Sequence, residues 1–138
     1  MPEAPAEKRV LDTFAIMALF NGEASADRIE NLLFDASQGK VELLMASVNL
    51  GEVWYCIARL ASPDLADHYT DELIALSVTI VDADWPLTRA AATIKARGNI
   101  SYADSFAAAL AKVHGAVLMT GDAEFKQLEN EIMIEWLI

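Results

Sequence analysis

Four acidic residues far apart in the chain stand where an apolar segment ends or where a predicted helix begins. They are Asp12, Glu52, Asp104 and Asp122, in the contexts RVLDT, SVNLGEVW, SYADSFAAA and VLMTGDAEF. Open α/β sheets assemble ligand sites at such junctions from segments distant in sequence. Carboxylates without a supporting His cluster favour a hard, oxygen-binding cation, Mg²⁺ or Mn²⁺, over zinc or copper. The four acids therefore predict a divalent metal site.

The net charge of the chain limits its partners. The chain has 10 Lys and Arg against 21 Asp and Glu, a net charge of −11 at pH 7, which argues against broad electrostatic adhesion to nucleic acid or to an anionic membrane. A bound divalent cation inverts the sign of an acidic pocket, so a phosphodiester substrate is compatible with this charge. Such a cation polarises a phosphoryl oxygen and lowers the pKa of a bound water. Metal-assisted phosphodiester hydrolysis is therefore the chemistry we favour.

Size and composition predict one soluble domain. The 138 residues suit a single domain spanning residues 1–138. Cys56 is the only cysteine, which excludes an intrachain disulfide and a cysteine-based zinc site. The segment MPEAPAEKRV lacks the basic flank and apolar core of a signal peptide, and no apolar stretch approaches the roughly 20 residues of a membrane span. We expect a cytoplasmic protein, and its 54% content of hydrophobic residues suggests a buried partner surface.

Apolar segments alternate with stretches of helical periodicity along the chain. The predicted strands cover residues 9–11, 41–46, 78–81, 116–120 and 132–137. The predicted helices cover residues 14–20, 24–38, 47–61, 62–77, 84–98 and 101–114, with a short one across 122–130. This alternation predicts an α/β fold, a three-layer sandwich with a central five-stranded parallel sheet.

The predicted sheet brings the four acids to one side. Asp12 and Asp122 follow the carboxyl ends of the first and fourth strands, where parallel sheets bind ligands. Asp104 opens the helix before the fourth strand, and Glu52 lies in the second turn of a helix that also follows a strand end. All four acids are therefore expected to face one cleft.

Three of the acids also have a purely structural interpretation as caps. Asp12 suits a helix N-cap, and Asp122 suits a turn or an N-cap. Asp104 lies three residues after Ser101, which is an approximate capping box. Each interpretation is reasonable alone, but all of them together are improbable, so the metal site is the better hypothesis.

Glu52 also has a structural interpretation, as part of a solvated helix face, and two further acids are expected to be solvated. Glu52 lies opposite the apolar stripe of its helix, and residues in such a position are usually solvated. The residues that share this face with it are Asn49, Cys56 and Arg59. Glu124 and Glu129 belong to a short helix whose acids are expected to be solvated, so both are left outside the predicted site.

The order of three segments resembles the PIN-domain family, specifically the VapC-type toxins of toxin–antitoxin pairs. The segments are VLDT, SVNLGEVWY and SYADSFAAALAKVHGAVLMTGDAEFKQLE. The similarity covers nearly the whole chain, and the block from Ser101 to Phe125 is its most specific part. The resemblance implies a PIN-like fold and an endoribonuclease dependent on Mg²⁺ or Mn²⁺. Its catalytic and metal-binding acids would be Asp12, Glu52, Asp104 and Asp122.

Two threonines and one phenylalanine extend the resemblance. Thr13 matches the Thr of the opening motif, and Thr120 matches a hydroxyl residue that orders the site beside Asp122. Phe14 stands where the family usually has a small hydroxyl or amide residue. This departure leaves open a catalytically weakened PIN-like binding or regulatory module. A receiver-like phosphoacceptor needs a paired early acid and a late Lys, and a haloacid-dehalogenase-like phosphatase needs an Asp in place of Phe14, so both match poorly.

The resemblance also implies partners. These are an RNA substrate, a small cognate antitoxin that blocks the site and binds operator DNA, and a second toxin copy in a homodimer, with higher toxin–antitoxin assemblies possible. The apolar surplus and the negative charge of the chain suit a partner segment with apolar anchors and with Lys or Arg facing the carboxylates.

Free of antitoxin, the protein is predicted to bind operator DNA negligibly, because a charge of −11 opposes association with phosphates. An electrophoretic mobility shift with the promoter DNA tests this, with the antitoxin complex as the positive control. A shifted band with the antitoxin-free protein would contradict the prediction.

Overall fold

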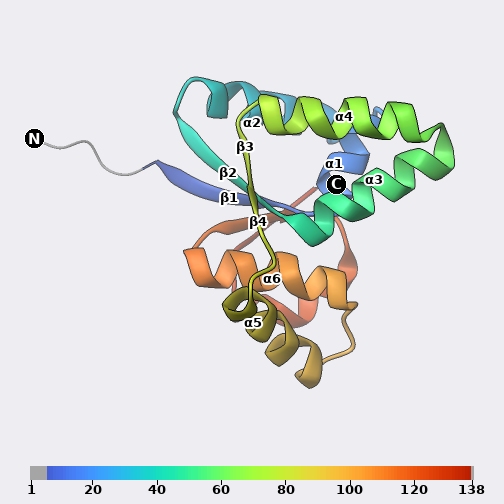
Figure 1. Cartoon of the computed structure of the whole chain (residues 1–138). Coiled ribbons are helices and arrows are strands. Elements are labelled where there is room, and N and C mark those ends of the chain that lie inside the picture. The colour runs from blue at the N-terminus through green and yellow to red at the C-terminus, as the bar shows by residue number, and fades with distance from the viewer. Residues whose placement is uncertain (1–5, 138) are drawn as a thin grey trace, which may run out of the picture.

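The computed structural model describes residues 6–137 (Figure 1). The strands are β1 (Glu7–Leu11), β2 (Val41–Ala46), β3 (Val78–Val81), β4 (Val117–Thr120) and β5 (Ile134–Trp136). The helices are α1 (Thr13–Phe20), α2 (Ala26–Ser37), α3 (Ser47–Leu60), α4 (Pro63–Ala75), α5 (Trp85–Arg97), α6 (Tyr102–His114) and the 3₁₀ helix η1 (Ala123–Leu128). Residues 1–5, the first half of the segment MPEAPAEKRV, lie outside the described residues. Within residues 6–137, no helix has both the length and the apolar character needed to cross a bilayer.

The strands form one parallel sheet in the order β3-β2-β1-β4-β5. The chain runs outward from β1 to β3 and then builds β4 and β5 on the other side of β1. The switch point between β1 and β4 is where open α/β sheets hold ligands. The predicted α/β sandwich with a five-stranded parallel sheet is confirmed.

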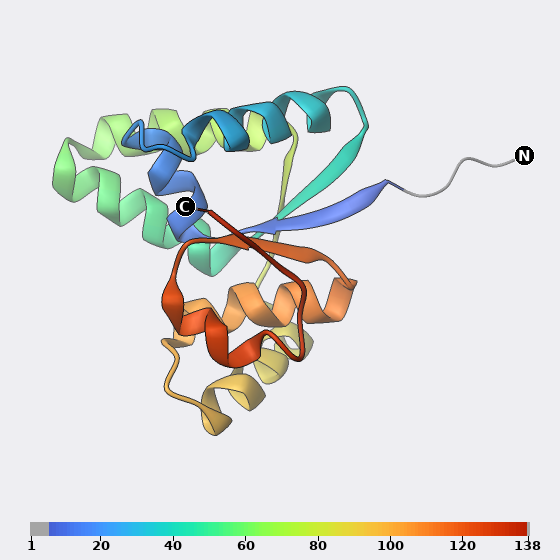
Figure 2. The ribbon, with the colours of Figure 1, turned by 180° about the vertical axis from the view of Figure 1, so that it is seen from behind.

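Helices cover both faces of the sheet (Figures 1 and 2). Helices α1–α4 lie on one face, and α5, α6 and η1 lie on the other. Neighbouring strand residues point to opposite cores: Val10 and Leu44 pack with α5 and α6, whereas Leu11 and Leu43 pack with the α1–α4 layer. Burial on both faces explains why the strands are continuous apolar runs in the sequence.

Side-chain caps determine where several helices begin. Asp12, Ser62, Asp84 and Ser101 each accept a hydrogen bond from the backbone N–H three residues further on, which is the N-cap interaction. Helix α6 ends at Gly115, whose φ of 59° is a left-handed conformation that glycine adopts without strain. Two of these caps, Asp12 and Ser101, also set the backbone beside the predicted site.

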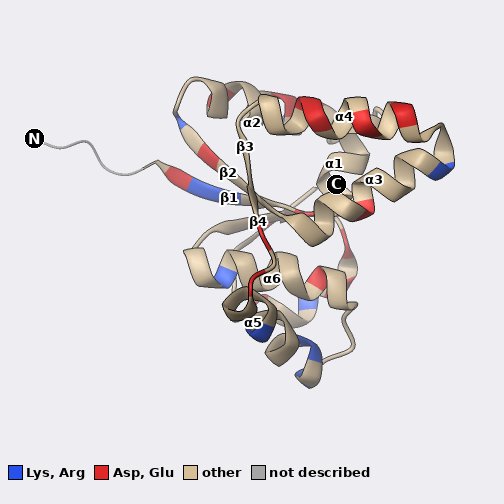
Figure 3. Ribbon diagram, in the orientation of Figure 1, with Lys and Arg blue, Asp and Glu red and all other residues tan. Residues whose placement is uncertain are grey.

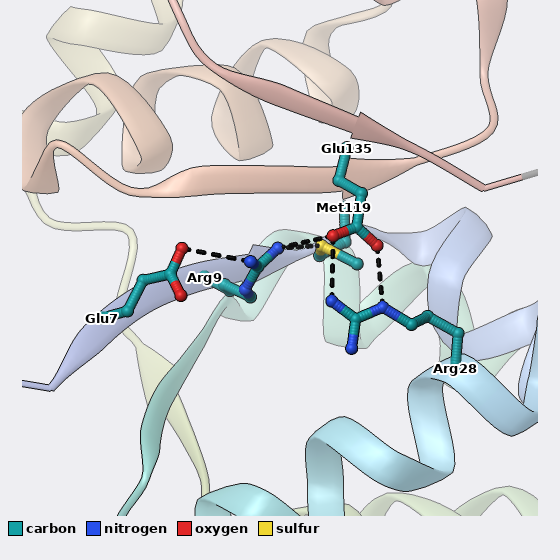
Figure 4. Close-up of polar contacts among 5 residues, drawn as sticks. All are labelled: Glu7, Arg9, Arg28, Met119 and Glu135. Carbon is teal, nitrogen blue, oxygen red and sulfur yellow. Dashed lines mark hydrogen bonds and ion pairs between the residues drawn. The ribbon is translucent and has the colours of Figure 1, made fainter.

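An ion-pair network ties the edge strand β5 to β1 and α2 (Figure 4). Arg9 Nη1 donates to Glu135 Oε1 at 2.9 Å and to Met119 Sδ at 3.1 Å. Arg28 on α2 donates from Nε and Nη2 to the two oxygens of Glu135, each at 2.9 Å. The Arg28 hydrogen bonds are the main cause of the lowered pKa of Glu135. The network therefore ties the helix α2 to the strands β1 and β5 of the sheet.

Candidate functional site

The four predicted acids line one cavity of about 380 Å³. Asp12 follows β1 and Asp122 follows β4, and these strands pair directly, so the two acids flank the switch point of the sheet. Glu52 enters from α3, and Asp104 enters from the first turn of α6. The structure thus brings together side chains from four separate segments.

Asp12 is the buried centre of this arrangement, with only 1% of its surface exposed. Its Oδ1 accepts a hydrogen bond from the Ala15 backbone N–H at 2.9 Å, and its Oδ2 accepts one from the Thr120 hydroxyl. The Thr120 hydroxyl oxygen in turn accepts the backbone N–H of Asp122 at 3.0 Å. Thr120 therefore links Asp12 to the backbone of Asp122.

Glu52 is held by three neighbours. Thr13 Oγ1 donates to Glu52 Oε1 at 2.7 Å, so the second predicted supporting threonine contacts a site carboxylate. Asn49 Nδ2 approaches the same oxygen at 3.4 Å, and the Tyr55 hydroxyl donates to Oε2 at 3.3 Å. Glu52 is therefore fixed by side chains of α1 and α3, which a freely solvated glutamate would not be.

Asn49 is a residue of the site region that the sequence interpretation placed wrongly. It was assigned to a solvated face, but it is fully buried, and its Nδ2 donates to the Ala103 carbonyl at 3.0 Å. This bond connects α3 to the first turn of α6. A signal existed, because Asn49 precedes the buried Val53 and Ile57 at the four-residue spacing of one helix face.

Asp104 lies close to Asp122 and to a third acid, Glu124. The Asp104 N–H donates to Ser101 Oγ at 3.1 Å, which is one half of the predicted capping box. The other half is replaced, because the Ser101 N–H donates to Glu124 Oε2 and not to Asp104. One carboxylate oxygen from each of Asp104, Asp122 and Glu124 lies within 4.8 Å of the others. The sequence interpretation left Glu124 outside the site, whereas the structure places it in the cavity wall. Its position two residues after Asp122, in the first turn of η1, was the available signal.

Most of the chain matches the model of one protein family. The family described as PIN domain matches residues 9–131, a span that contains every acid of the cavity. The chain belongs to the PIN-domain family. No curated protein sequence matches this PIN domain.

Solved structures share the fold of this PIN domain at low sequence identity. DNA-bound VapBC from Salmonella typhimurium is 22% identical with a TM-score of 0.73, over 94% of this chain and 97% of that chain. VapBC2 from Rickettsia felis, bound to a fragment of its promoter, is 19% identical with a TM-score of 0.72, over 93% and 97%. VapC20 from Mycobacterium tuberculosis, a toxin that cleaves the sarcin-ricin loop, is 19% identical with a TM-score of 0.69, over 86% and 93%. At these identities the likeness shows the fold.

Two acids of the PIN domain have strongly raised pKa values. Burial raises the pKa of Asp12 to about 7, against the lowering effect of the bonds from Thr120 and Ala15. Burial also raises the pKa of Asp104 to about 8, with further contributions from a hydrogen bond to Glu124 and from the charge of Asp122. The pKa of Glu124 is lowered, chiefly by the same bond. The raised pKa of Asp104 thus reflects burial together with crowding by the carboxylates of Glu124 and Asp122.

The donor set fits a hard divalent cation. Every ligand-type group in the cavity is a carboxylate or a hydroxyl, which are the oxygen donors that Mg²⁺ and Mn²⁺ prefer. Oxygens that share one octahedral ion lie roughly 3–4 Å apart, and a carboxylate oxygen of Asp104 already lies within 4.8 Å of one of Asp122. Asp12 and Glu52 line the same cavity and add charge to it.

Phe14 lines the cavity beside these acids and is 37% exposed. Its ring packs over the backbone of Gly121. A Cβ built on Gly121 would lie 2.3 Å from Phe14 Cε1 and 2.8 Å from the Leu137 carbonyl oxygen. Gly121 has no side chain, and this leaves room for the large ring of Phe14.

Without divalent ions, the PIN domain is expected to lose stability as the pH rises. The pKa of Asp12 is about 7 in the folded protein against an ordinary value of 3.8, so the folded state binds more protons between these values. Stability is therefore full below the ordinary value and declines up to about pH 7. In EDTA, Asp12→Asn should raise the melting temperature at about pH 8 and have little effect at about pH 4. Thermal denaturation measures both, and identical pH profiles for the two proteins would contradict the assignment.

Gly121→Ala is expected to destabilise the PIN domain by about 1–3 kcal/mol, because the new methyl group overlaps the Phe14 ring and the Leu137 carbonyl. Gly51→Ala is the matched control, since a Cβ on Gly51 in α3 meets nothing within 4 Å. That control should stabilise by about 0.5–1 kcal/mol through helix propensity. Urea denaturation compares the two, and equal effects would rule out the packing of Phe14 on Gly121.

Proposed function

We propose that this PIN domain is a divalent-metal-dependent endoribonuclease, the toxin of a toxin–antitoxin pair, acting in the cytoplasm. The observation that carries the proposal is the cavity in which Asp104, Asp122 and Glu124 bring their carboxylate oxygens within 4.8 Å of one another, beside Asp12 and Glu52. Membership in the PIN-domain family supports a nuclease. The likeness to a toxin that cleaves the sarcin-ricin loop supports RNA as the substrate.

The side chains of the cavity divide the work between binding and orientation. Asp12, Glu52, Asp104 and Asp122 hold Mg²⁺ or Mn²⁺ in this proposal. A bound cation of this kind polarises a phosphoryl oxygen, activates a water molecule and neutralises charge in an in-line phosphoryl transition state. Thr120 orients Asp12, and Thr13 orients Glu52, through the hydrogen bonds to their carboxylates. The hydroxyl residues thus keep the carboxylates pointed into the cavity before a cation arrives.

The charge distribution supports a basic protein partner, which we propose to be the antitoxin. Acidic residues concentrate on α2 and α4, whereas Lys and Arg gather on α5 and α6 (Figure 3). The α1–α4 layer also exposes Phe34, Ile74 and Leu76, at 61%, 52% and 50%. An acidic face with apolar side chains suits a segment that carries apolar anchors and Lys or Arg. The likeness to a toxin–antitoxin complex from Klebsiella pneumoniae supports such a partner, and a toxin homodimer belongs to the same proposal.

Phe14 favours a second candidate, a PIN-like binding or regulatory module with a weakened site. Its ring occupies part of the cavity wall, where the family usually has a small hydroxyl or amide residue. The five carboxylates around it argue for the enzyme, because a binding module has no need of so many buried or crowded acids.

RNA cleavage by antitoxin-free protein is expected with Mg²⁺ or Mn²⁺ and is expected to stop in EDTA. Asp12→Asn and Asp104→Asn should each lower the rate about 100-fold or more, because each removes a charged cation ligand. Glu129→Gln is the matched control, since Glu129 is exposed and lies outside the cavity, and it should cleave like the wild type. Gel-based cleavage of structured and single-stranded RNA measures the rates.

Two outcomes separate the proposal from its alternatives. Equal cleavage by the wild type and both Asn variants would show a contaminating ribonuclease. Tight RNA binding without any cleavage by the wild type in Mn²⁺ would favour the binding module.

A further inference from the structure

A four-residue loop between α5 and α6 sets the position of Asp104. It consists of Gly98, Asn99, Ile100 and Ser101, and its last residue caps α6 by accepting the Asp104 N–H at 3.1 Å. Asp104 is therefore placed in the cavity by the backbone of this loop. A loop that ends in a helix cap determines where the first turn of the helix lies.

Side chains from α5 and η1 hold each of the last three residues of the loop. Gln127 Nε2 donates to the Asn99 carbonyl at 3.2 Å, and Lys95 Nζ donates to the Ile100 carbonyl at 2.8 Å. The Ser101 N–H donates to Glu124 Oε2 at 3.2 Å. Two of these three contacts come from the same short helix, η1.

Gln127 also braces η1 internally and fills the space beside Gly98. Its Nε2 donates to the Glu124 carbonyl at 2.9 Å. A Cβ on Gly98 would lie 2.4 Å from Gln127 Oε1 and 3.4 Å from its Cδ, and no other atom of the described residues beyond its chain neighbours lies within 4 Å. Because Asp122 caps the same helix, η1 connects Asp122 to the loop that precedes Asp104.

We propose that Glu124 and Gln127 are positioning residues that hold loop 98–101, and with it the Asp104 carboxylate, opposite Asp122 before a cation binds. This inference rests on the proposed metal-binding role of the cavity. When Asp104 is ionised, its carboxylate and that of Asp122 repel each other, so an untethered loop would let Asp104 move away from Asp122. The contacts from η1 oppose that movement, and outer contacts of this kind orient the groups that bind a metal.

The comparison of Glu124→Gln with Glu124→Ala tests the role of Glu124. A glutamine keeps an oxygen for the Ser101 N–H and supplies an amide donor toward Asp104, whereas alanine keeps neither. Mn²⁺ binding without RNA, measured by titration calorimetry, should weaken about tenfold or more in the alanine variant and by less than about threefold in the glutamine variant. If glutamine weakens Mn²⁺ binding as much as alanine does, Glu124 is a direct ligand and its positioning role is overturned.

A double-mutant cycle between Gly98 and Gln127 tests the second contact. Gly98 has an extended φ of −143°, so alanine fits its backbone and disturbs only the Gln127 side chain. Gly98→Ala and Gln127→Ala should each weaken Mn²⁺ binding several-fold, and the double variant should be no weaker than Gln127→Ala alone. Additive losses would overturn the role of Gln127.

Amide hydrogen exchange in metal-free protein gives a readout independent of activity. The Ser101 N–H should exchange about fivefold faster in Glu124→Ala, because it loses its acceptor, and at nearly the wild-type rate in Glu124→Gln. Unchanged exchange in Glu124→Ala would overturn the proposal. Glu129→Ala, which removes a neighbouring exposed acid, should change neither exchange nor Mn²⁺ binding. A wild type that binds Mn²⁺ but cleaves no RNA would refute the nuclease and leave these tests intact.

Discussion

The removal of carboxylates from water at one end of the sheet is the constraint on which the rest of this PIN domain depends. Asp12 is almost completely buried, and a buried charge needs hydrogen bonds, an opposite charge or a proton. The Ala15 N–H and the Thr120 hydroxyl reduce the desolvation penalty without cancelling it, because the pKa of Asp12 is raised to about 7. The parallel pairing of β1 with β4 keeps Asp12 and Asp122 close in spite of their repulsion. The fold therefore maintains a site whose electrostatics favour a cation.

The same acids cap helices and line the cavity, so their structural and functional interpretations do not exclude each other. Asp12 is the N-cap of α1, Asp122 is the N-cap of η1, and Asp104 lies in the first turn of α6. The partial positive charge at a helix N-terminus stabilises a nearby carboxylate. In α1 and α6, a helix that begins at the switch point both orients an acid and offsets part of its charge. This arrangement lets one cavity collect several carboxylates without a basic side chain in its wall.

Phe14, the departure from the family pattern, is accommodated by a residue far away in the chain, Gly121. Its ring occupies the space that a side chain at position 121 would fill, and Gly121 lies in the turn between β4 and η1. The cavity thus keeps its carboxylates while one part of its wall is aromatic. Phe14 therefore gives the cavity wall a partly exposed aromatic surface.

The sequence by itself determined the fold class and the approximate location of the four acids. The two-sided burial of strands and the periodicity of helices are local properties, and the end of an apolar segment marks the end of a strand. Only the tertiary structure decided that Asn49 is buried against α6 and that Glu124 joins Asp104 and Asp122. Those contacts depend on how α3 packs beside α6 and on how the turn after β4 directs η1. Local spacing marks the helix face that carries Asn49 and the turn that carries Glu124, but the segment that each of them meets is decided by packing between segments distant in the chain.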